Sequence, residues 1–186
     1  MKKFLLVLIS VLSLIVFSGC KDDPAEKKPT ATQTTPPSKQ EEKTINQEVS
    51  FYYPDDAVMY LCPETLTVST RETEFLETIV HTLINGPVSE ELNPSISGKV
   101  NVLSATLEDN ICTVDLSEEF AKHNTGGSTK ETMAVYSIVN TLCGIDGIEK
   151  VKINIGGNEN PDFGGHFDLS EPLLPDLSII EPGQNN

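Results

Sequence analysis

The stretch VNVLSATLEDNICTVDL, residues 100–116, decides the fold. It contains two runs of alternating apolar residues, separated by Asp109-Asn110, a pair that is typical of a tight β-hairpin turn. A two-residue turn leaves the two runs side by side, so the stretch predicts a pair of antiparallel strands. The apolar residues predicted to share one face of the first strand are Leu103, Ala105 and Leu107.

Helices are predicted on both sides of this hairpin. The first follows Ser69, which forms a capping-box pattern with Glu72, and it ends at residues 85–87, Asn-Gly-Pro. The glycine is predicted to adopt the left-handed conformation that ends helices, and proline prevents any continuation. The second helix shows the same capping-box spacing at Ser128 and Glu131.

Further alternating runs complete the predicted domain. They occur at residues 49–53, 58–62 and 150–155, with a short extended piece at 66–68. The order strand, strand, helix, strand, strand, helix, strand predicts an α+β domain, with two helices packed on one face of a small mixed or antiparallel sheet. Residues 163–180 are rich in proline and are predicted to form an irregular cover.

The chain begins with the pattern of a secretory signal. Lys2 and Lys3 precede an apolar run at residues 4–17, which is shorter than the roughly 20 residues that span a membrane. Phe17-Ser18-Gly19-Cys20 then resembles the lipobox of bacterial lipoproteins, in which the cysteine is acylated and becomes the new N-terminus. This predicts lipidation at Cys20 and a location on the outer face of the cytoplasmic membrane. The alternative is an ordinary cleaved signal with an incidental cysteine.

The segment after the signal has the composition of a tether. Residues 21–47 contain four prolines and balanced charges but almost no large apolar side chains, so burial cannot offset their conformational entropy. The sequence therefore predicts a signal at 1–19, a lipidated cysteine and disordered tether at 20–47, one domain at 48–180, and a disordered tail at 181–186.

The charge of the predicted domain limits its partners. Residues 48–186 contain 23 acidic residues and only six lysines and arginines, a net charge of −17. Nucleic acid and anionic lipid headgroups would be repelled by such a surface. Basic or neutral partners are therefore expected.

Three cysteines follow Cys20 in the sequence. Cys62, Cys112 and Cys143 each lie in an apolar pattern, and an odd number leaves at least one of them unpaired. They are interpreted as small buried hydrophobic residues. The sequence leaves open whether two of them form a disulfide, which export permits. No C-x-x-C spacing supports redox chemistry or a zinc site.

Several short patterns follow one another in a fixed order along the predicted domain. They are Tyr53-Pro54-Asp55, Leu61, Pro63-Glu64, and residues 83–87, 109–110, 114–120, 151–157 and 164–170. This series resembles the GerMN domain of spore-germination and sporulation lipoproteins of Gram-positive bacteria. The founding member of that family carries two such domains in tandem, whereas this chain carries one.

The resemblance implies a non-catalytic domain, related in fold to the ring-building modules of secretion machineries. It implies a role in envelope assembly through other exported proteins or peptidoglycan, with no catalytic residue and no cofactor.

Candidate catalytic and metal-binding residues are few. His81 is expected on a helix surface and His123 in a polar loop, while His166 and Asp168 are spaced as metal ligands could be. The resemblance implies a structural role for that pair. Other patterns considered are a partial calcium loop at Asn158, Asn160 and Asp162, the adjacent carboxylates Glu118 and Glu119, and a cap from Asp115 or Ser117.

The leading hypothesis is an interaction module that binds exported envelope or sporulation proteins. The alternative is a lipoprotein that binds peptidoglycan or another polysaccharide, although the chain has no tryptophan on which a sugar ring could stack. An unrecognised envelope hydrolase is the third and most distant hypothesis.

Overall fold

The computed structural model describes residues 43–124, 127–159, 161–164 and 167–183. The predicted signal, Cys20 and the tether up to residue 42 lie outside these residues. In chain order the elements are β1 (Thr44–Pro54), β2 (Leu61–Arg71), α1 (Phe75–Asn85), β3 (Val102–Glu108), β4 (Ile111–Leu116), α2 (Glu119–His123), α3 (Ser128–Cys143), β5 (Lys150–Ile155), β6 (Asp162–Phe163) and β7 (Phe167–Asp168).

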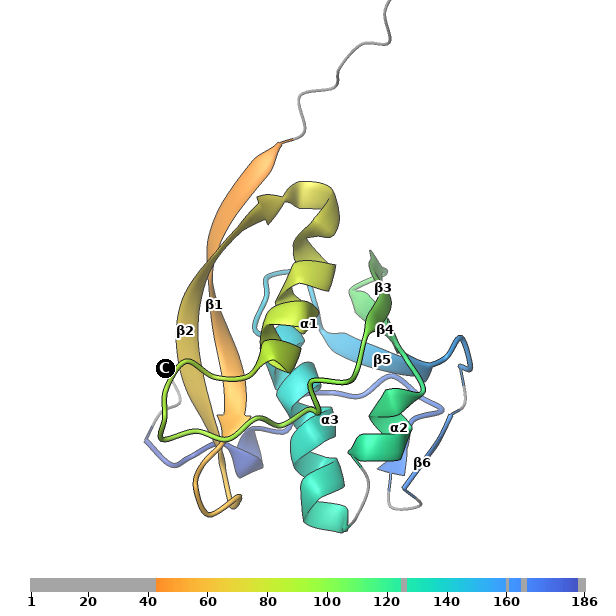
Figure 1. Cartoon of the computed structure of the whole chain (residues 1–186). Coiled ribbons are helices and arrows are strands. Elements are labelled where there is room, and N and C mark those ends of the chain that lie inside the picture. Colours follow the sequence, from red (N-terminus) through yellow and green to blue (C-terminus); the bar gives the residue numbers. More distant parts are fainter. Residues whose placement is uncertain (1–42, 125–126, 160, 165–166, 184–186) are drawn as a thin grey trace, which may run out of the picture. The chain divides into compact units, whose positions relative to one another are not determined.

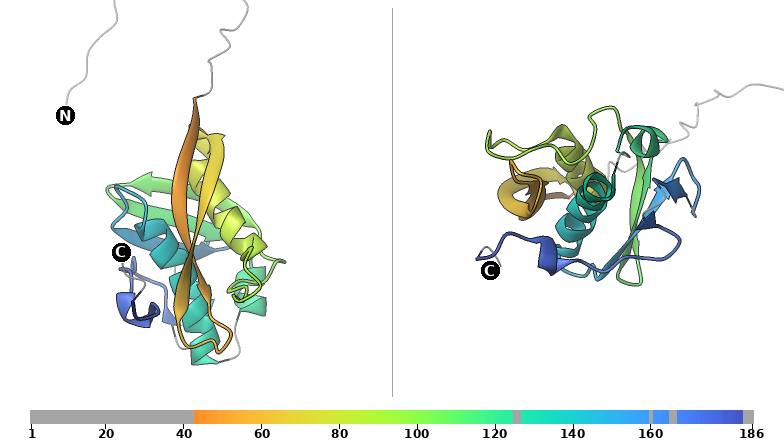
Figure 2. Two further views of the ribbon diagram at one scale, coloured as in Figure 1. Left: turned by 90° about the vertical axis from the view of Figure 1, so that its left-hand side faces the viewer. Right: turned by 90° about the horizontal axis from the view of Figure 1, so that it is seen from below.

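The folded unit has a layered α+β arrangement. The ribbon β1–β2 lies on one side, α1 and α3 lie in the middle, and the sheet β3–β4–β5 lies on the other side (Figures 1 and 2). Helix α1 contacts β2 and β3, while α3 contacts β1 and β5. The predicted α+β class is confirmed, but the first two strands pair with each other in a separate two-stranded sheet.

The ribbon β1–β2 is longer than the sequence predicted. Its register runs from Thr44 opposite Arg71 to Pro54 opposite Leu61, and replaces the three short pieces predicted at 49–53, 58–62 and 66–68. Strand β1 begins at Thr44, so the predicted end of the tether at residue 47 is wrong by four residues. The reason is that Ile45 continues the inward alternation of Val49 and packs against the core.

The predicted hairpin at residues 100–116 is confirmed. Asp109 and Asn110 have φ values of 48° and 64°, as a primed two-residue turn requires, and β5 adds to β4 in parallel. The prediction that Leu103, Ala105 and Leu107 share one face is wrong. A bulge between Val102 and Ser104 interrupts the alternation of side chains at Leu103.

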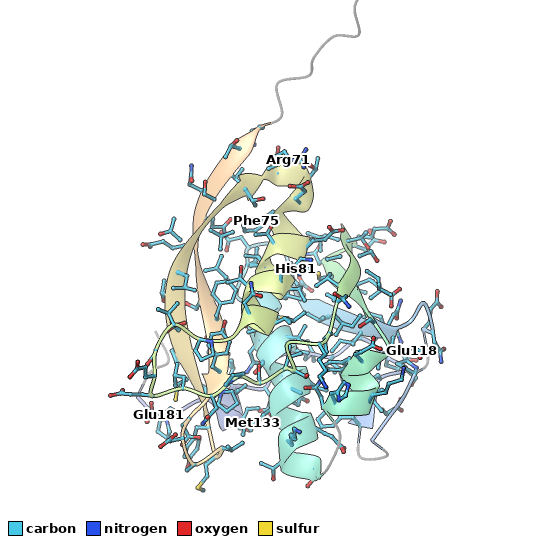
Figure 3. All side chains as sticks on the ribbon, viewed as in Figure 1. Arg71, Phe75, His81, Glu118, Met133 and Glu181 are labelled. Atoms are coloured by element: carbon cyan, nitrogen blue, oxygen red, sulfur yellow. The ribbon has the colours of Figure 1, made fainter. Side chains whose placement is uncertain are left out.

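Helix α1 ends at the predicted position but begins later than predicted. At its end Gly86 has φ 88° and its N–H donates to the Leu83 carbonyl over 3.2 Å. At its start Ser69 belongs to β2, where it pairs with Asn46, and Glu72 opens a 3₁₀ turn. The predicted capping box therefore does not form. An ion pair between Arg71 and Glu74 lies at this corner instead (Figure 3).

Helix α3 begins and ends close to the predicted positions, but its capping box is also wrong. Ser128 is the first helical residue, the cap position is Gly127, and no side chain caps it. Glu131 instead is buried, with 1% of its surface exposed. A Cβ added at Gly164, whose φ is 63°, would overlap the Glu131 carboxyl. This close approach explains why glycine stands at position 164.

The C-terminal segment covers the molecule as predicted. Leu173 exchanges two backbone hydrogen bonds with Val151 on the free edge of β5, at 2.9 and 2.8 Å. Ile180 lies beside Leu61, and the Glu181 N–H donates to the Leu61 carbonyl over 3.0 Å. The predicted domain end at residue 180 is therefore one residue short. The short helix α2 was not predicted, because its five residues carry too little periodicity.

Candidate functional site

The first candidate site is built around the turn that joins β1 to β2. The Asp55 carboxylate accepts hydrogen bonds from the backbone N–H groups of Met59 and Tyr60, at 2.7 and 3.0 Å. Val58 has φ 54°, a backbone conformation that is strained for a β-branched residue. The sequence predicted a strand at residues 58–62, but residues 58–60 belong to the closed turn and β2 begins at Leu61.

A second carboxylate fixes the loop after α1. Glu64 on β2 accepts the N–H groups of Val88 and Ser89, at 2.9 and 2.8 Å. Hydrogen bonds from two backbone donors to an ionised carboxylate are stronger than neutral ones. This loop is thereby held against the ribbon, next to the turn of Asp55.

Between these groups lies a hollow of about 330 Å³. The residues that line it are Asp55, Cys62, Pro63, Glu64, Ser89, Glu91, Leu92 and Glu181. Burial, followed by the contact with Glu181, raises the pKa of the Cys62 thiol to about 11. Its Sγ donates to the Glu181 Oε2 over 3.5 Å, at the base of the ribbon in Figure 3. The thiol is therefore protonated near neutral pH and is no nucleophile.

The polar side chains that line this hollow are mainly hydrogen-bond acceptors. Its four carboxylates complement ammonium or guanidinium groups, and its thiol adds no reactivity. No group of three His, Cys, Asp or Glu side chains that could hold a metal occurs among the residues that the structure describes.

A second hollow, of about 390 Å³, lies over the sheet on the side away from the helices. Ile111 and Thr113 of β4 and Lys152 and Asn154 of β5 line it together with Pro172. The Lys152 ammonium is engaged, because its Nζ donates to the backbone carbonyls of Leu169 and Ser170 at 2.7 and 2.5 Å. This lysine therefore anchors the C-terminal cover and offers little to an anionic ligand.

The residues that the sequence suggested as metal ligands or catalytic groups do not form a common site among the described residues. His81 is exposed on α1 (Figure 3), and His123 is the last residue of α2 rather than part of a loop. His166, Asn160 and the side chain of Asp162 lie outside the described residues. Asp168 accepts a hydrogen bond from the Ser170 N–H over 2.9 Å. Hydrogen bonds from the Ser170 side chain, and then from its backbone, lower the pKa of Asp168. The exposed Asp168 thus closes a local turn.

The remaining residues that the sequence suggested as catalytic or capping groups have structural roles. Glu118 and Glu119 both approach the Lys122 ammonium, at 2.9 and 3.7 Å. The predicted cap from Asp115 or Ser117 is wrong, because no side chain caps α2. Asp115 instead accepts the Gly157 N–H over 3.0 Å, which fixes the turn after β5.

Sequence reasoning missed a set of buried polar residues. Asn140 exchanges two hydrogen bonds with the backbone of Asp176, at 2.9 and 3.0 Å. Thr141 accepts the Tyr52 N–H over 3.1 Å, and Asn124 accepts the Ser97 N–H over 2.9 Å. These residues tie loops and strands to the helices. A polar residue within an otherwise apolar helix face was the available signal.

The three cysteines are free in the structure. Cys112 is fully buried and Cys143 is half-buried, as the sequence predicted for small hydrophobic residues. No helix in the described part of the chain has both the length and the hydrophobicity of a membrane span.

Comparisons with solved structures support the fold. A candidate lipoprotein of Clostridium perfringens is 26% identical, with a TM-score of 0.51 over 70% of this chain and 87% of that one. The first GerMN domain of the sporulation protein GerM from Bacillus subtilis is 23% identical, with a TM-score of 0.57 over 69% of this chain and 97% of the domain. The tandem GerMN domains of GerM are 19% identical, with a TM-score of 0.56 over 72% of this chain and 45% of the pair.

A family model gives the assignment by sequence. No curated protein matches the chain. Residues 50–161, more than half of the chain, match the model described as "Germane: Sporulation and spore germination". The chain belongs to the Germane family, whose domain the sequence patterns had predicted under the name GerMN.

Proposed function

We propose that this chain is an extracytoplasmic lipoprotein, anchored through Cys20, whose folded domain acts without catalysis by binding other exported proteins. Its process is sporulation, spore germination or assembly of the cell envelope. Membership of the Germane family supports the process, and the similarity to a candidate lipoprotein supports the anchor.

The observation that carries the binding role is the distribution of charge. Residues 48–186 have a net charge of −17, and the hollow near the ribbon is lined by four carboxylates. A field of one sign raises the association rate of partners of the opposite sign. Cationic exported proteins are therefore the expected partners.

A paired binding experiment tests this role. The full chain, expressed in a spore-forming Gram-positive bacterium, is crosslinked in living cells and recovered from membranes, while a parallel sample is sedimented with purified sacculi. We expect discrete protein adducts whose yield falls as salt rises, and no sedimentation with sacculi. Sedimentation without protein adducts would favour the peptidoglycan-binding alternative and overturn the proposal.

Growth conditions provide the second readout. Deletion of the gene is expected to lower the yield of heat-resistant spores, or their germination, more than it lowers vegetative growth. A wall defect during growth with normal spores would restrict the role to envelope maintenance.

A further inference from the structure

The sheet β3–β4–β5 has one closed edge and one open edge. The β5 edge is closed by the two hydrogen bonds between Val151 and Leu173. On the other edge, β3 pairs with β4 alone, and no backbone hydrogen bond of the described residues reaches its outer side. An edge strand of this kind presents a row of unpaired N–H and C=O groups.

The turn chemistry identifies the backbone groups that face outward. A two-residue turn makes its flanking residues, Glu108 and Ile111, a hydrogen-bonded pair. Because such pairs alternate along antiparallel strands, Thr106 also bonds to β4, whereas Ala105 and Leu107 direct their N–H and C=O groups away from it. These two residues form the usable part of the edge.

The side chains of β3 give this edge little protection. Leu103 and Leu107 are 53% and 43% exposed, so neither side chain is covered by the rest of the domain. Natural edge strands are usually protected by lysine or proline, and β3 contains neither. The bulge at Leu103 shortens the regular edge but leaves residues 104–108 in register with β4.

The charge at the end of β3 selects the occupant. Glu108 and Asp109 are both exposed at this end, on a domain whose net charge is −17. A second copy of the chain would bring an equally acidic domain to this edge. A strand with basic residues would instead be attracted, and its apolar side chains could cover Leu107.

We propose that the open edge of β3 binds an extended segment of a cationic partner protein by strand addition, with a basic residue of that segment against Glu108. This inference rests on the proposed function and assigns the surface that performs it. Main-chain hydrogen bonds to Ala105 and Leu107 supply the affinity, and the charge supplies the preference.

A peptide pair provides the probe. The full chain in detergent micelles is titrated with acetyl-KTVTVK-amide and with its acidic twin, acetyl-ETVTVE-amide, while amide hydrogen exchange is followed. We expect the basic peptide to slow exchange at Ala105 and Leu107, and to bind at least tenfold more tightly than the acidic one. Equal binding of the two peptides, or no protection of these amides, overturns the proposal.

Two variants separate the edge from the charge of the whole domain. Leu107→Pro removes an outward N–H that β4 does not use, so the domain should keep its melting transition but bind the basic peptide at least tenfold more weakly. Glu108→Lys should reverse the preference toward the acidic peptide. Glu48→Lys, an equal charge change at an exposed position on β1, should leave the preference unchanged.

The outcomes also separate this inference from the proposed function. If Leu107→Pro keeps its protein adducts in cells, the binding role stands and the β3 assignment is wrong. Protection of Ala105 that grows with protein concentration in the absence of peptide would show pairing between copies, which also overturns the proposal. Loss of the adducts in Leu107→Pro but not in Leu177→Pro would support it.

Discussion

Gly86 shows how one residue meets two constraints at once. Its φ of 88° is combined with a ψ of 173°, so it is not in the left-handed helical region that the sequence predicted. The following proline disfavours helical ψ values in the residue before it, which moves Gly86 to an extended ψ. This combination of angles is accessible essentially to glycine alone.

A Gly86→Ala substitution therefore should destabilise the domain through the backbone. An added Cβ would lie 3.5 Å from the Pro94 Cγ, an ordinary contact, so packing is not the reason. We expect a cost of about 1–3 kcal/mol in the free energy of unfolding, measured in urea. Gly98→Ala is the control, because Gly98 has no positive φ and open space around it, and alanine there should be neutral or stabilising. Equal effects of the two would contradict the argument.

The thiols make a prediction about pH. Burial raises the pKa of Cys112 to about 12, with a smaller contribution from Cys143, and raises the pKa of Cys143 to about 11. The pKa of each thiol is higher in the folded chain than its unfolded value of about 8.5, so protonation of the thiols favours the folded state over the unfolded state. The stabilisation is fully present below that value and is lost as pH rises through about 11 for Cys143 and about 12 for Cys112.

We therefore expect the free energy of unfolding to fall between about pH 9 and pH 12, with a shallower fall in Cys112→Ala. A thiol reagent should react slowly with the folded domain and completely in denaturant, and the half-buried Cys143 should react first. Rapid labelling of Cys112 in the folded state would show that the site opens easily.

At the scale of elements, the sequence predicted those whose signals are local. The turn at Asp109-Asn110 and the end of α1 depend on residues that are adjacent in the chain, and both were found. The start of α1 was missed because strand pairing places Ser69 opposite Asn46, a partner that no local pattern reveals. Gly164 likewise depends on Glu131, which is distant in sequence.

Helix α3 illustrates why the buried polar residues were missed. Amphipathic periodicity assumes one apolar face, but α3 contacts β1 on one side and β5 on the other. Ser137, Asn140 and Thr141 are consequently buried although they are polar. The candidate hollows were missed for a different reason: each is lined by elements that are far apart in the chain, and no local sequence pattern reveals that they meet.

Asn140 offers a test of this helix. Asn140→Ala would leave the N–H and C=O of Asp176 without their partners, so we expect a loss of about 1–3 kcal/mol in the free energy of unfolding. Faster hydrogen exchange at Leu173 and Ile180 should accompany it, because the C-terminal cover is released. Asn46→Ala, at an exposed position on β1, is the matched control and should leave both measurements unchanged.

At the scale of the whole molecule, the sequence predicted the class of the domain but not the separation of its strands into two sheets. Both strand pairs are antiparallel hairpins, and alternation reports which residues face a core without reporting which sheet they join. The contacts of α1 and α3 with both sheets decide that question, and they exist only in the folded chain.

The last prediction concerns the attachment of the molecule to a membrane. The chain has four cysteines, and the other three lie in the folded domain, so lipidation is expected at Cys20 alone. Each buried methylene of an acyl chain contributes about 0.8 kcal/mol, and two or more chains give stable anchoring. We expect Cys20→Ala to incorporate no fatty-acid analogue and to be released to the medium or left unprocessed. Cys62→Ala should remain labelled and membrane-bound. Fatty-acid labelling that persists in Cys20→Ala would show that another residue carries the lipid.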